Sequence, residues 1–185
     1  MTRIMPFAVG TALLSLALTF NGRAGGLPAG QVDFGTFTPP SGGAQFVEVN
    51  LTSNLISLAA KLVEKQEPDV AQLLNGLQMV SVHVIGLTDE NRDDIKDRME
   101  KTRKELLTKG WDRIVAARQE GKDVGIYLKT QNKDTVQGLV VTVLDGNEHA
   151  VFINIVGDIK PEKLALLGER LHIDPLKNLP KPDEK

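Results

Sequence analysis

Apolar residues along the chain recur at two spacings, which predicts both strands and helices. Alternating apolar positions at 46–51 and 77–85 are typical of strands with one buried face. Between them, residues 53–63 repeat apolar side chains three and four positions apart, as an amphipathic helix does. Residues 68–76 start with Pro and end with Gly, which indicates a second, shorter helix.

A long charged helix and four further strands are predicted after residue 87. The helix begins at Thr88 or Asp89 and ends near Lys109, and its only apolar line is Ile95, Met99 and Leu106. Short connections join the strands, and one of them holds an Asp-Gly pair, so an antiparallel meander is expected. The four strand-like runs are 111–117, 122–129, 135–144 and 149–156. A last helix is expected after Asp158, with Leu164, Leu167 and Leu171 on one line.

This order, β-α-β-α-β-β-β-β-α, predicts an α+β fold: a two-layer domain with a largely antiparallel sheet and helices on one face. The domain is expected to span residues 44–171. Residues 25–43 are rich in Gly and Pro and are typical of a linker, and residues 172–185 are expected to form a flexible tail.

The N-terminus has the three parts of a secretory signal peptide. Arg3 is followed by an apolar stretch over 4–20 and then by small residues, so residues 1–24 are expected to be removed after Ala24, with Ala29 as another possible cleavage site. The alternative is an uncleaved membrane anchor, for which this stretch is at the short limit. We therefore expect a periplasmic or secreted protein with no stable membrane span after signal removal.

Charge and cysteine content narrow the classes of function. Removing residues 1–24 takes away two arginines and no acid, so the net charge falls from -2 to -4. An acidic chain is a poor match for nucleic acid, which attracts basic surfaces. The chain has no Cys, which excludes disulfides, thiolate zinc sites, thiol nucleophiles and a lipid-anchor Cys.

Parts of the meander are similar to a known family. The relevant runs are Trp-Asp-Arg-Ile at 111–114, Val-Gly-Ile-Tyr-Leu-Lys at 124–129, Gly-Leu-Val-Val at 138–141 and Ile-Asn-Ile-Val-Gly-Asp-Ile at 153–159. In these runs the chain resembles the bacterial family catalogued as domain of unknown function 4252, over about residues 46–168. The resemblance implies an exported or envelope protein with no assigned activity. Some members look like lipoproteins, which this chain without Cys cannot be.

No run of residues forms a known catalytic or metal-binding motif. The three histidines, His83, His149 and His172, are scattered. Ser81 and His83 share a strand face, but residues at this spacing are expected to lie roughly 7 Å apart, which is too far for direct proton transfer. Asp93, Asp94 and Asp97 are interpreted as a solvated helix face, and the acids around His149 as part of a hairpin turn. No catalytic residue, metal or cofactor is predicted.

Two groups of residues are candidates for recognition. Trp111, Tyr127 and His83 could form a ligand or partner surface if they lie on an exposed sheet face. In the linker, Val32, Phe34 and Phe37 form an apolar patch that either docks on the domain or recognises another chain.

The predicted function is therefore a non-enzymatic binding or interaction domain in the cell envelope, whose partner is an unknown envelope protein or small ligand. One alternative is a hydrolase-type enzyme whose site is assembled from distant residues. The other is a structural or assembly component that pairs through an exposed strand edge.

Overall fold

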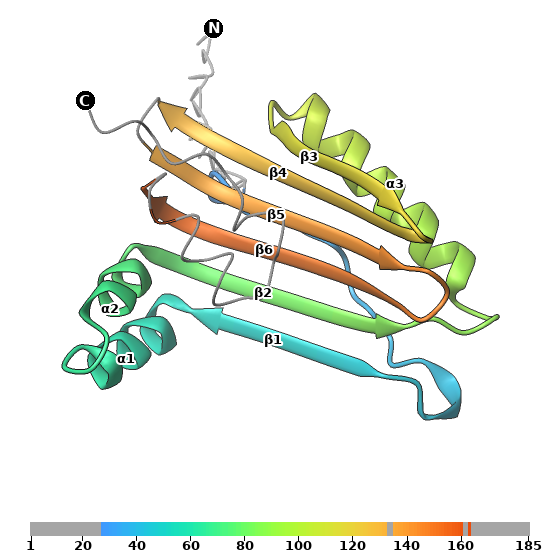
Figure 1. Cartoon of the computed structure of the whole chain (residues 1–185), viewed down its shortest axis with the longest axis horizontal. Helices are drawn as coiled ribbons and strands as arrows, with labels where there is room; N and C mark the ends of the chain where they lie inside the picture. The colour runs from blue at the N-terminus through green and yellow to red at the C-terminus, as the bar shows by residue number, and fades with distance from the viewer. Residues whose placement is uncertain (1–26, 133–134, 161–162, 164–185) are drawn as a thin grey trace, which may run out of the picture.

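A six-stranded antiparallel sheet organises the protein (Figure 1). The computed structural model describes residues 27–132, 135–160 and 163. The strand order is β1-β2-β6-β5-β4-β3, so the last four strands form the predicted meander. The strands are β1 (Phe46–Thr52), β2 (Leu77–Gly86), β3 (Asp112–Gln119), β4 (Lys122–Asn132), β5 (Thr135–Asp145) and β6 (His149–Ile159). The helices are a 3-10 turn η1 (Ser41–Gly43), α1 (Ser53–Val63), α2 (Pro68–Asn75) and α3 (Arg92–Thr108). The α+β class and the antiparallel sheet are confirmed.

Tight turns keep the meander in register. Glu120 and Gly121 connect β3 to β4, and both have positive φ angles, 51° and 83°. Paired positive angles match the right-handed twist of the strands that they join. At the next described turn, Asp145 pairs with His149, and the backbone N–H of Glu148 donates to the carbonyl of Asp145 at 2.9 Å.

One face of the sheet is aliphatic. A row of buried side chains crosses four strands in register: Val80, Ile155, Leu139 and Leu128. The helices α1 and α2 lie at one end of the sheet, where Ile56 and Leu73 join the same cluster (Figure 1). Toward the other end, Val84, Val143 and Val151 are only partly buried.

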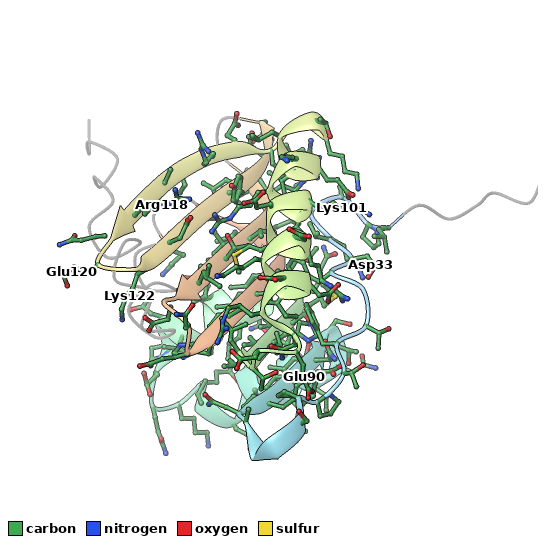
Figure 2. The ribbon with its side chains drawn as sticks, turned by 90° about the vertical axis from the view of Figure 1, so that its right-hand side faces the viewer. Asp33, Glu90, Lys101, Arg118, Glu120 and Lys122 are labelled. Atoms are coloured by element: carbon green, nitrogen blue, oxygen red, sulfur yellow. The ribbon has the colours of Figure 1, made fainter. Side chains whose placement is uncertain are left out.

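The opposite face, which we call the α3 face, is aromatic and is covered by α3. Ile95, Met99 and Leu106 are buried, and they pack with a cluster that includes Phe152 and Tyr127. The rest of α3 is largely polar and faces outward (Figure 2). The apolar line expected for this helix is therefore the line that packs.

Residues 27–40 cross the α3 face without forming a strand (Figure 1). The fully buried side chain of Asn154 holds this segment: its Oδ1 accepts from the N–H of Val32 at 2.9 Å, and its Nδ2 donates to the carbonyl of Gly30 at 2.9 Å. A Cβ on Gly138 would lie 2.6 Å from the Cα of Gly30, so the backbones cross where neither residue has a side chain. Phe34 and Phe37 are buried beyond this crossing.

Three boundaries differ from those predicted. Asp158 does not cap a helix, because β6 continues to Ile159 and the Asp158 N–H donates to the carbonyl of Gly76 at 2.8 Å. The strand β3 begins after Trp111, and α3 begins at Arg92. The predicted signal peptide, the final helix beyond Asp158 and the C-terminal tail lie outside the described residues. Among the described helices, none is both long and apolar enough to cross a membrane.

Candidate functional site

A cavity of about 360 Å³ opens between α3 and the β3–β4 hairpin. We call it the arginine groove, because arginines come from both of its walls. Helix α3 forms one wall and β3 the other, while β4 forms the floor. Its lining residues are Glu100, Arg103, Lys104 and Leu107 of α3, Arg113, Ala116, Ala117 and Arg118 of β3, and Asp123, Val124, Gly125 and Tyr127 of β4.

Small residues leave space at the floor of the arginine groove. Ala116 pairs with Gly125 in the β3–β4 ladder. A Cβ on Gly125 would lie 2.9 Å from Cε2 of Tyr127 and 3.0 Å from Oγ1 of Thr142. A side chain at position 125 would therefore displace the Tyr127 ring, which lies on the same face two residues along β4. Glycine at this position lets the buried ring fold over the strand.

A shared ion pair joins the two walls. Arg103 Nη1 lies 2.8 Å from one oxygen of Asp123, and Arg118 Nε donates to the other at 3.1 Å. Arg103 Nε also donates to Oγ1 of Thr142 at 2.9 Å. The side chains of Arg103 and Asp123 are each 18% exposed, whereas that of Arg118 is 82% exposed. Asp123 therefore fixes the position of Arg103, and the exposed Arg118 binds the same carboxylate from the rim of the groove. Figure 2 shows Arg118 on the outer strand.

The protonation state of Asp123 follows from this arrangement. Burial alone would raise the pKa of its carboxyl, but hydrogen bonds from Arg118 and Arg103, together with their charges, outweigh burial and hold the pKa below its usual value. Asp123 is therefore a carboxylate at neutral pH, and its negative charge is shared between two guanidinium groups.

The arginine groove carries a positive charge in an acidic protein. Four cations face two acids there, Glu100 and Asp123, which leaves a local net charge of +2, whereas the whole chain has -2. Lys104 and Arg113 are exposed, and within the described residues neither has a hydrogen-bond or ion-pair partner. Their donors are free to bind an anion.

A family model described as a domain of unknown function, DUF4252, matches residues 41–167. The chain belongs to this family. The match covers the whole described sheet and the three α-helices that the structure describes. No significant match was found among curated proteins or among solved structures.

The DUF4252 domain brings Trp111, Tyr127 and His83 to one face, but it does not expose them as a platform. Trp111 is 5% exposed, Tyr127 1% and His83 8%. The cause is α3 together with residues 27–40, which cover this face of the sheet. Tyr127 still borders the arginine groove, and Trp111 lines a separate cavity of about 350 Å³ between α3 and residues 27–40.

The side chains of Ser81 and His83 meet, although their backbone spacing had argued against it. Ser81 Oγ lies 3.0 Å from Nε2 of His83, and it donates to Oδ1 of Asn50 at 2.9 Å. The expectation from the sequence was wrong because two side chains on one strand face can lean toward each other across the Cα spacing. The rings of Phe34 and Phe37 pack against His83, and burial lowers the pKa of its imidazole. This pair is covered and does not line the arginine groove.

The residues around the β5–β6 turn could supply metal ligands. Ligand atoms of Asp145, Glu148 and His149 lie within 4.8 Å of one another, and this is the one such group among the described residues. However, Lys122 Nζ lies 3.0 Å from the Asp145 carboxylate, so a cation already neutralises it. On α3, Asp94 pairs with Arg98 at 3.4 Å, as expected for a solvated helix face.

The sequence patterns do not predict the arginine groove. Arg103 lies in a helix so rich in charges that its solvated and buried positions look alike. One available indication was β3, where Arg113 and Arg118 flank small alanines. Strict alternation along β3 would place Arg113 and Arg118 on opposite faces of the sheet. The bulge between Arg113 and Val115 shifts the alternation, so both arginines lie on the α3 face.

Proposed function

We propose that this protein is exported to the bacterial cell envelope, where its DUF4252 domain binds a small carboxylate ligand in the arginine groove without converting it. The observation that carries the proposal is the positive charge of the groove, where Arg113 and Lys104 lie on opposite walls and have no partner among the described residues. A guanidinium group presents paired donors that match a carboxylate. The groove volume also falls within the range of small-molecule sites.

Binding is favoured over catalysis by the chemistry of the lining. Asp123 is held ionised by two arginines, so it is a weak base. Ser81 and His83, the pair suited to hydrolysis, are both buried, and the rings of Phe34 and Phe37 pack against His83. The lining can therefore hold and orient an anion, and it has no activated nucleophile beside the bound group.

Citrate is a suitable probe, because its carboxylates offer planar acceptors to both walls. We expect saturable binding in a calorimetric titration, which weakens as salt screens the exposed cations. Replacing Arg113 by Gln should weaken binding by about 10-fold to 150-fold, since a charge-assisted hydrogen bond contributes roughly 1.5–3 kcal/mol. Lys61→Gln, on the distant helix α1, is the matched control and should bind like the wild type. Equal affinities for Arg113→Gln and the wild type would contradict the assignment.

Export is tested separately by the mass and location of the cellular form. The leader-like pattern of residues 1–24 predicts a protein that begins at Gly25 and is recovered with the periplasmic fraction. Fractionation followed by intact-mass measurement reports both properties. Recovery from the cytosol with Met1 still present would refute export while leaving the carboxylate site untouched.

A further inference from the structure

Within the described residues, the backbone groups on the outer edge of β1 have no strand partner. β1 is the last strand on its side of the sheet, and no described segment pairs beyond it (Figure 1). The N–H of Gly86 donates to the carbonyl of Gln45, so Gln45 directs its backbone groups toward β2. Backbone direction alternates along a strand, and therefore Glu48 and Asn50 direct theirs away from the sheet. Phe46 and Thr52 do the same at the two ends.

The two edges of the sheet differ in how they are protected. β3, the other edge, has a bulge between Arg113 and Val115 and carries several charges. Bulges and charges are the usual devices that prevent an edge strand from pairing. β1 has an uninterrupted register with β2 and no Pro or Lys, and Glu48 is its only charge. β1 is therefore open to pairing where β3 is protected.

Apolar side chains surround this open edge. Val47, Val49 and Leu51 lie on the aliphatic face of β1 and are 36–38% exposed. The next element, α1, buries Ile56 and Ala60 but leaves a second apolar line in solvent. That line consists of Leu55, Leu58 and Leu62, which are 52%, 56% and 74% exposed.

We propose that β1 pairs in antiparallel fashion with β1 of a second copy of this chain, about a two-fold axis at Val49. Phe46–Thr52 is symmetric about this residue, so all seven positions pair. Glu48 then faces Asn50 of the second copy, which avoids a like-charge contact. In this register the outward-directed backbone groups of Glu48 and Asn50 form hydrogen-bonded pairs, and Val49 faces Val49 as a non-hydrogen-bonded pair. Centring on Glu48 would instead oppose two carboxylates.

The apolar line on α1 extends the same interface. A stable interface buries roughly 800 Å² on each partner, more than one strand edge provides. Thr52 pairs with Phe46 of the second copy, so α1 begins beside the residues that lead into the second copy's β1. The exposed leucines of α1 are then available to contact the second copy. The arginine groove lies at the opposite edge of the sheet, so the dimer and the carboxylate site are independent.

Cross-linking tests the register directly, because the chain contains no Cys. Val49→Cys should form a disulfide-linked dimer in full-length protein treated with oxidised glutathione, since opposed Cα atoms in such a pair lie about 4.5 Å apart, within disulfide range. The control Ile114→Cys, at 37% exposure on the protected edge, should stay unlinked. Equal cross-linking of the two variants, or none at position 49, would overturn the proposal.

Light scattering on the untreated protein gives the second test. The wild type should have the mass of a dimer at micromolar concentration, and Val49→Lys and Val49→Glu should each be monomeric because like charges meet at the axis. Mixing these two variants should restore the dimer. A monomeric wild type, which would leave the edge for a different protein, refutes the proposal, as does a Val49→Lys variant that remains dimeric.

Discussion

Replacing Phe37 by alanine is expected to lower the free energy of unfolding by about 3–5 kcal/mol, the usual cost of removing a buried aromatic ring. The Phe37 ring is 6% exposed, and its centroid lies 5.0 Å from that of Phe152 and 4.9 Å from that of His83. Arg98 covers the other side, with Cζ 4.8 Å from the ring centroid. Urea denaturation followed by circular dichroism measures the change.

The same variant should raise the pKa of His83, because burial is what lowers it. Titration of the imidazole by NMR reports this shift independently of global stability. Leu27→Ala is the matched control, since Leu27 lies in the same segment but is 54% exposed, and it should change stability by less than about 0.5 kcal/mol. If Phe37→Ala behaved like Leu27→Ala, residues 27–40 would not be part of the folded core.

Replacing Asn154 by alanine is expected to cost about 3 kcal/mol. Its side chain makes three hydrogen bonds, with Val32, Gly30 and Leu139, and is fully buried. Alanine would remove the side-chain partner of the Val32 N–H and of the Gly30 carbonyl, at a penalty of roughly 1–3 kcal/mol for each group that water does not reach. Thermal or urea unfolding gives the magnitude.

Asn154→Ala should also release residues 27–40 from the sheet, and faster amide hydrogen exchange at Val32 would report this release. Asn54→Ala, at an exposed position of α1, provides the comparison and should unfold like the wild type. Unchanged exchange at Val32 in Asn154→Ala would show that the aromatic rings alone hold the segment, contrary to our account.

The fold could be predicted from local patterns because each element has a clear period. Alternation in β4 and β5 and the turn at Glu120–Gly121 specify neighbouring strands without long-range information. The position of residues 27–40 could not be predicted in this way. A Gly-rich and Pro-rich composition indicates a linker, and the residue that holds it, Asn154, lies 122 positions beyond Val32 and has apolar neighbours on both sides in its strand.

The candidate site was harder to predict, because it depends on ion pairs between residues of different secondary-structure elements. Arg103 and Asp123 are 20 residues apart, and neither differs in type from its charged neighbours. Only packing distinguishes them: α3 lies on the sheet so that Arg103 faces Thr142 while Lys104 next to it stays exposed. Similarly, the exposed leucines of α1 looked like core positions, because helical periodicity does not say how many sides of a helix are covered.

The contact between the start and the end of the described chain has a consequence for the order of assembly. Gly30 and Asn154 are separated by 124 positions, and closing so large a loop slows folding. In the export that we propose, the N-terminus would cross the membrane first, so Phe34 and Phe37 would arrive long before β6 and the aromatic cluster would stay incomplete for most of the passage. This topology would delay the completion of folding, which would help to keep the chain unfolded until almost all of it has been translocated.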